Sequence, residues 1–69
     1  MSETVIHFHQ VVNTPNGKGI VQGRVELHGE ETGILVSHDP VTSGEWVRQQ
    51  PDWKGFWLLR SYDPNLISV

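Results

Sequence analysis

The stretch VVNTPNGKGIVQGRVEL, residues 11–27, decides the fold class of this chain. Pro15 fixes its own φ angle, and the Asn16-Gly17 pair accepts positive φ angles, a combination that strongly favours a β-hairpin. Beyond the turn, residues 20–27 alternate between two faces with the period of two that is typical of a strand. We therefore predict a hairpin that turns at Asn16-Gly17 and has a well-formed second strand.

Strands are also predicted on both sides of this hairpin. Residues 5–12 alternate in the same way and indicate a first, half-buried strand. Residues 34–37 indicate a short third strand, which stops at Asp39-Pro40 because proline cannot donate to a β-ladder. Asp39 is expected to accept hydrogen bonds from the turn that follows.

The last third of the chain predicts two further strands. Residues 55–61 are the most apolar stretch and suggest a central strand that is covered on both faces. Residues 62–65 have the composition of a turn or a single 3₁₀ turn, and residues 66–69 form a last short strand. Residues 45–48 are either a short strand or the end of a longer one. In total, the sequence predicts about five strands and almost no helix.

The same alternation predicts which side chains form the core. The apolar positions on the inner faces are Ile6, Phe8, Val12, Val21, Val25, Leu35 or its neighbours, and Leu58.

Composition limits both the size of this core and the possible classes of function. The chain, residues 1–69, is one domain, and a domain of this size buries only about 60% of its surface on folding. It has no cysteine, so stability must come from aromatic packing or from self-association. A net charge of −3 disfavours generic nucleic-acid binding. No apolar run is long enough for a membrane span or a signal peptide, so the expected compartment is the cytoplasm.

Two segments resemble the SH3-like barrel superfamily. Residues 12–21 resemble its opening hairpin, in which a strand leads into T-P-x-G-x-G and then a valine. The Tyr-Asp-Pro-Asn segment, residues 62–65, resembles the 3₁₀ turn before the last strand of such barrels. The resemblance implies an all-β, five-stranded antiparallel SH3-like barrel. Because this superfamily includes peptide binders, nucleic-acid binders, assembly subunits and some enzymes, it implies no single activity.

A candidate binding surface lies in the second half of the chain. Its aromatic and basic composition is favoured at the centres of protein interfaces. It consists of Trp46, Trp53 and Tyr62, rimmed by Arg48, Lys54 and Arg60. The alternative interpretation is a second small hydrophobic cluster that closes one end of the barrel.

The histidines suggest two further kinds of site, and neither is complete. His7 and His9 lie at i and i+2 on the predicted first strand, so both could ligate one metal ion, but two ligands do not make a site. His38-Asp39, near Ser37 and Ser43, has the residue types of a hydrolytic triad but no nucleophile elbow. We therefore predict no metal, no cofactor and no catalytic residues.

The sequence favours a non-catalytic interaction module that binds a protein partner or a second copy of itself as a homo-oligomer. A nucleic-acid-associated barrel is the alternative, if the basic residues gather on one face. Those residues are Lys18, Arg24, Arg48, Lys54 and Arg60. A third possibility is an oligomeric enzyme with a site at a subunit interface.

Overall fold

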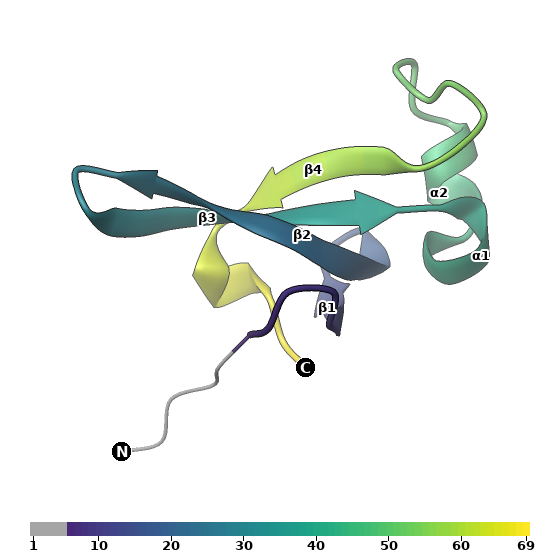
Figure 1. Cartoon of the computed structure of the whole chain (residues 1–69). Helices are drawn as coiled ribbons and strands as arrows, with labels where there is room; N and C mark the ends of the chain where they lie inside the picture. Colours follow the sequence, from purple (N-terminus) through teal and green to yellow (C-terminus); the bar gives the residue numbers. More distant parts are fainter. Residues whose placement is uncertain (1–5) are drawn as a thin grey trace.

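The fold is an antiparallel sheet with its four strands in the order β1-β2-β3-β4. A computed structural model describes residues 6–69 (Figure 1). The strands are β1 (Val11–Thr14), β2 (Gly17–Leu27), β3 (Glu30–His38) and β4 (Leu58–Tyr62). Two single-turn helices, α1 (Pro40–Ser43) and α2 (Glu45–Arg48), follow β3, and a 3₁₀ turn, η1 (Pro64–Leu66), follows β4. The all-β prediction is confirmed, and the four strands form an open sheet.

The opening hairpin forms as predicted, but its turn lies one residue earlier in the chain than expected. Thr14 pairs with Gly17, so the two turn residues are Pro15 and Asn16. Gly17 has a φ angle of 104°, a conformation that favours glycine. The Thr14 hydroxyl donates to the Gly17 carbonyl at 2.7 Å and accepts from the Asn16 amide, which fixes the turn.

Two β-bulges change which side chains of the β2–β3 hairpin reach the core. Val21 pairs with Val36, but Gly23 pairs with Leu35, so Gln22 is an extra residue in β2. One extra residue exchanges the two faces of a strand beyond it. Val25 is consequently 40% exposed, although the unbroken alternation predicted it in the core. A second register shift follows between Val25 and Glu26.

The predicted first strand is shorter than expected because a turn interrupts it. His9 has a φ angle of 67°, and the Gln10 amide donates to the His7 carbonyl at 3.1 Å. Phe8 therefore lies exposed in the turn and stacks on His9, which corrects its predicted place in the core. Ile6, before the turn, is buried as predicted, and Val5 lies outside the described residues.

The core lies against the half of the sheet that is farther from the β2–β3 turn. Of the predicted core residues, Val12, Val21 and Leu58 are buried as well as Ile6. In β3 the buried apolar side chains are those of Ile34 and Val36, the neighbours of Leu35. The further buried residues are Val47, Tyr62, Ser37 and His38.

The chain leaves β3 through the two short helices, at the end of the molecule opposite the β2–β3 turn (Figure 1). Asp39 caps α1 as predicted, because its Oδ1 accepts from the amides of Val41 and Thr42 at 2.8 Å. Residues 45–48 were predicted to be a short strand or the end of a longer one, but they form the helix α2. No helix among residues 6–69 has the length and apolar character to cross a membrane.

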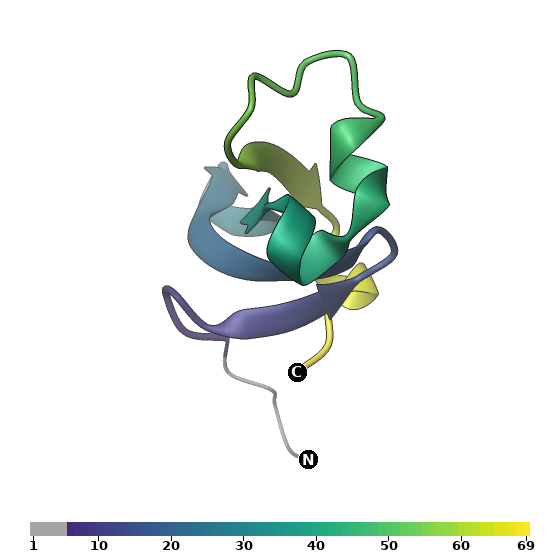
Figure 2. The same cartoon turned by 90° about the vertical axis from the view of Figure 1, so that its right-hand side faces the viewer.

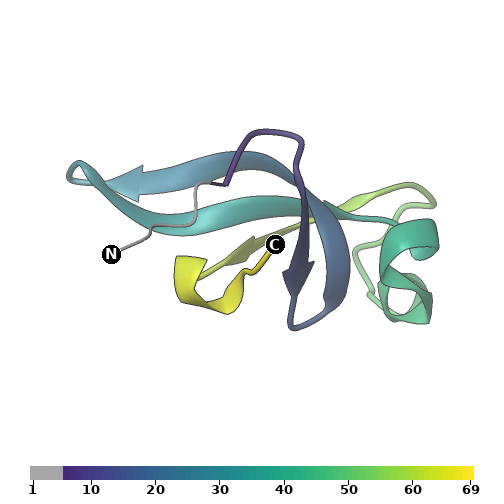
Figure 3. The ribbon, with the colours of Figure 1, turned by 90° about the horizontal axis from the view of Figure 1, so that it is seen from below.

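The C-terminal segments differ from the prediction in two ways. β4 begins only at Leu58 and pairs with β3 alone, so it is an edge strand and not a central one. The 3₁₀ turn forms as predicted, with the Asp63 carboxylate accepting from the Asn65 amide. In place of a last strand, Ser68 makes an isolated bridge to Asn13 that brings the C-terminus beside β1 (Figures 2 and 3).

Gly19 permits the closest approach between β2 and β3. A Cβ atom at this position would meet the Val36 side chain and lie 2.8 Å from the Ser37 carbonyl oxygen and 3.2 Å from His38 Cε1. By contrast, a Cβ atom on Gly23 would meet nothing within 4 Å. Of these two glycines, only Gly19 is therefore required by packing.

We predict that Gly19→Ala lowers the free energy of unfolding by about 1–3 kcal/mol, because the methyl group overpacks the core. Gly23→Ala is the matched control and should be neutral or stabilise by up to about 1 kcal/mol. Urea denaturation followed by tryptophan fluorescence measures both. Equal effects of the two substitutions would contradict this packing.

Candidate functional site

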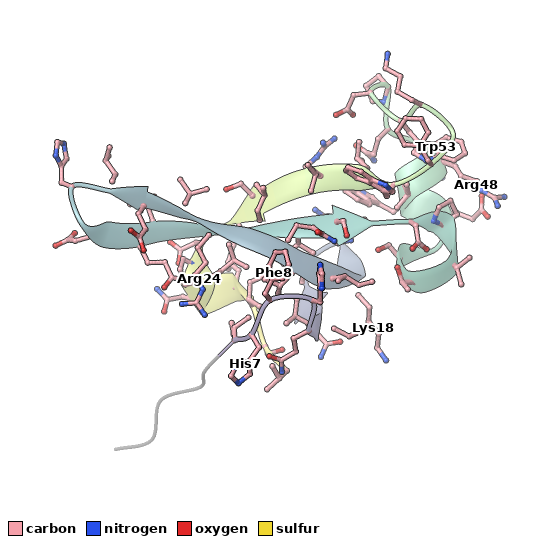
Figure 4. The ribbon with its side chains drawn as sticks, in the orientation of Figure 1. His7, Phe8, Lys18, Arg24, Arg48 and Trp53 are labelled. Atoms are coloured by element: carbon pink, nitrogen blue, oxygen red, sulfur yellow. The ribbon has the colours of Figure 1, made fainter. Side chains whose placement is uncertain are left out.

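An aromatic surface lies at the α2 end of the molecule, on α2, the loop of residues 49–57 and the start of β4. We call it the aromatic end. Trp53 and Arg48 mark it in Figure 4. It comprises Trp46, Arg48, Trp53, Lys54, Phe56, Trp57, Leu59 and Arg60, and Asp52 lies within it.

Arg60 organises the inner part of this surface. Its guanidinium donates to both carboxylate oxygens of Asp52 at 2.8 Å and lies 5.9 Å from the centroid of the Trp46 ring. The hydrogen bond from Arg60 lowers the pKa of Asp52, and the same bond raises the pKa of Arg60. A two-point arginine–carboxylate pair fixes geometry as well as charge. The pair therefore ties the start of the loop to β4.

The outer part of the aromatic end is apolar and exposed. The Trp53 indole donates to the Phe56 carbonyl and closes the loop on itself. Phe56 and Trp57 are 59% and 54% exposed, and their rings meet edge to face with centroids 6.2 Å apart. Two large aromatic side chains thus face solvent side by side.

The structure brings together most of the binding residues predicted from the sequence. Trp46, Trp53 and Arg60 share the aromatic end, with Arg48 and Lys54 exposed on it. Arg48 pairs with Glu45 at 3.3 Å.

One predicted binding residue lies elsewhere, and two exposed ones were missed. Tyr62 is only 8% exposed, and its hydroxyl is engaged inside the protein, so it adds no exposed surface. Phe56 and Trp57 escaped the sequence analysis because their apolar run was interpreted as a buried strand. The Gly55 that precedes them, with a φ angle of 99°, was the available sign of a loop.

A buried polar cluster lies directly beneath Trp46. The His38 ring is fully buried and meets the Trp46 ring edge to face at 5.3 Å. Its Nδ1 lies 2.6 Å from Ser43 Oγ and 3.2 Å from the Lys18 carbonyl oxygen, and its Nε2 lies 2.7 Å from the Tyr62 hydroxyl. The Tyr62 oxygen accepts a further bond from Asn16 Nδ2 at 2.9 Å.

These partners define the protonation of His38. The Lys18 carbonyl can only accept, so it favours a hydrogen on Nδ1. Tyr62 accepts from Asn16 and has its own hydrogen to give, so it donates to an unprotonated Nε2. A second ring proton would leave the buried Tyr62 hydroxyl hydrogen without an acceptor among these groups. Burial of the ring is the main cause that lowers the pKa of His38, and the charge of Arg60 adds to it.

The same arrangement argues against a hydrolytic role for Ser43 and His38. Ser43 Oγ donates to the Lys18 carbonyl, and the proton on His38 Nδ1 faces this same serine oxygen and carbonyl. A general base must offer a free lone pair to the nucleophile, and Nδ1 does not offer one. The contact is therefore a structural hydrogen bond.

His7 and His9 were predicted to share one face of a strand, but they lie in the turn of residues 7–10 that precedes β1. Both are exposed, and they do not share a face of one strand. Within residues 6–69, no group of three His, Cys, Asp or Glu side chains is placed to hold a metal ion.

We predict that the free energy of unfolding falls as the pH drops below about 6.5, the ordinary pKa of histidine. The unfolded chain gains a proton on residue 38 in that range, whereas the folded chain keeps a neutral His38 until the pH passes its lowered pKa. The expected contribution has a slope of up to about 1.4 kcal/mol per pH unit and is absent above that range. Urea denaturation across a pH series measures it.

The control for this prediction is His38→Gln, which should lose the His38 contribution to the slope. If that variant does not fold, ¹⁵N NMR of the native imidazole decides the matter alone. A His38 ring that gains its proton at or above pH 6.5 would contradict the assignment of a neutral, Nδ1-protonated ring.

Comparison with known proteins assigns this chain to no family. The resemblance of its hairpin and its 3₁₀ turn to SH3-like barrels therefore stays a prediction. No protein-family model, no curated protein and no solved structure matches the chain.

Proposed function

We propose that this chain is a non-catalytic interaction module that binds a protein partner, or a second copy of itself, through the aromatic end. The observation that carries the proposal is the exposure of Phe56 and Trp57 beside Trp53. Exposed aromatic side chains at the centre of a polar rim are the usual anchors of protein interfaces. Arg48 and Lys54 supply such a rim here.

The rigidity of the loop supports the same proposal. The Asp52–Arg60 pair holds one part of the loop, and the bond from Trp53 to the Phe56 carbonyl holds another. A surface that is ordered before binding loses less conformational entropy when its partner arrives. The loop is thus suited to present Phe56 and Trp57 to a partner.

We also propose that the fold is a five-stranded SH3-like barrel and that the protein acts in the cytoplasm, as the sequence predicts. The backbone of Asn13 exchanges hydrogen bonds of 2.7 and 3.1 Å with Ser68, next to η1. This pairing runs between β1, one edge of the sheet, and the C-terminal segment, in which the sequence predicts the fifth strand. It supports closure of the sheet without completing it.

The distribution of basic side chains disfavours the nucleic-acid alternative. Three of the five are paired with carboxylates, in Arg24–Glu31, Arg48–Glu45 and Arg60–Asp52. Arg24, Lys18 and Arg48 lie on separate parts of the molecule (Figure 4). The phosphate-binding face that this alternative needs would require a gathered set of free cations.

We predict that a photo-crosslinking residue at position 57 captures a protein partner in the native cell. The matched control is the same residue at position 66, because Leu66 is equally exposed on η1, away from the aromatic end. The captured protein is then purified and titrated by calorimetry. Trp57→Ala should weaken binding by about 2 kcal/mol, roughly 30-fold, and Leu66→Ala by less than about 0.5 kcal/mol.

Two results would contradict the proposed function. One is equal capture at positions 57 and 66, or equal effects of the two alanine substitutions. The other is tight binding of a single-stranded oligonucleotide whose affinity falls steeply with salt, which would favour the nucleic-acid alternative.

A further inference from the structure

The far half of the β2–β3 hairpin projects from the rest of the molecule (Figure 1). We call residues 23–33 the acidic arm. It carries Glu26, Glu30 and Glu31 against the single cation Arg24, and Arg24 already pairs with Glu31. Val25 and Leu27 are exposed on it. The arm is therefore both acidic and apolar.

Both edges of the arm are open within the described part of the chain. β1 pairs with β2 only through Ile20, and β4 pairs with β3 only from Ile34 onward. The arm is thus a ribbon of two strands, an arrangement that is marginal by itself in water. Unpaired backbone groups along a strand edge favour the addition of another chain.

The aromatic end has a small excess of positive charge. It carries Arg48, Lys54 and Arg60 against Glu45 and Asp52, and the pairs Arg48–Glu45 and Arg60–Asp52 leave Lys54 as its unpaired cation within residues 6–69. Its strand, β4, is also an edge strand, and Leu59 on that strand is exposed. The two ends lie on opposite sides of a molecule whose longest dimension is 38 Å (Figure 1).

We infer that copies of this chain associate head to tail, with the acidic arm of one copy against the aromatic end of the next. The inference rests on the proposed function, because it names a second copy as the occupant of the aromatic end. Val25, Leu27 and Glu30 share one face of the arm, because Leu27 pairs with Glu30 across the hairpin. The two apolar side chains cover Phe56 and Trp57, and the Glu30 carboxylate then faces the Lys54 side chain.

Charge favours the contact of an arm with an aromatic end over a contact between two like ends. A contact between two arms brings their glutamates together, and one between two aromatic ends brings the two Lys54 side chains together. Like charges placed opposite one another weaken such contacts, whereas a positive patch against a negative one favours association. Made between successive copies, this contact builds rings or chains, and two antiparallel copies that make it twice form a two-fold dimer.

The test is a charge exchange between two full-length variants, measured by sedimentation velocity over a concentration series at low salt. The arm variant is Glu30→Lys, which leaves the Arg24–Glu31 pair intact. The end variant is Lys54→Glu, which leaves Arg48 on Glu45 and Arg60 on Asp52. The native chain should show mass that rises with concentration, and added salt should weaken its association.

Each variant alone should associate at least tenfold more weakly than the native chain, and an equal mixture of the two should regain association, because the reversed arm then meets the reversed end. Circular dichroism and urea denaturation establish that both variants fold.

Two results would overturn the inference: a native monomer at high concentration, or a mixture that associates no more strongly than its components. A native monomer that still captures a foreign protein through position 57 would overturn self-association and leave the proposed function standing. Association that survives both Trp57→Ala and the charge reversals would contradict the inference and the proposed use of the aromatic end together.

Discussion

The structure depends on one buried ring, that of His38, whose two nitrogens are both hydrogen-bonded. Nδ1 faces Ser43 and the Lys18 carbonyl, and Nε2 faces the Tyr62 hydroxyl. These contacts join β3 to β2, to α1 and to β4 through a single side chain. In a domain of 69 residues without cysteine, such a cluster contributes stability that other proteins obtain from a larger core or from disulfides. No buried side-chain nitrogen or oxygen among residues 6–69 lacks a partner.

The cluster also connects the interior to the surface. Trp46 covers the His38 ring on one side and lies under the Arg60 guanidinium on the other. Arg60 in turn holds Asp52 at the start of the loop that exposes Phe56 and Trp57. The loop therefore rests on the core through a short series of direct contacts, which explains how a long irregular segment can hold aromatic side chains in a defined position.

The sequence predicted the features that local chemistry determines. The opening hairpin, the cap at Asp39 and the 3₁₀ turn after Asp63 all follow from residues within a few positions of one another, although the hairpin turns at Pro15-Asn16 and not at Asn16-Gly17. It did not predict what depends on pairing between distant segments. The bulge at Gln22 depends on the register against β3, and that register moved Val25 out of the core. The turn at His9 needed a positive φ angle in a residue other than glycine, which alternation alone does not reveal.

For the candidate site, the composition of residues 46–60 indicated the right region but not the right exposure. The sequence did not indicate the structural role of His38. That role depends on the Tyr62 hydroxyl, which lies 24 residues from His38 along the chain. The same hydroxyl accepts from Asn16, which is 46 residues from Tyr62.

The close approach at Gly19 has a consequence for how this sequence can change over evolutionary time. The missing side chain at position 19 leaves the space that the Val36 methyl and the His38 ring occupy. A larger residue at position 19 would also meet the Ser37 carbonyl oxygen, a backbone atom that no change of side chain removes. Among divergent descendants of this chain, position 19 should therefore stay glycine, while position 23 varies freely.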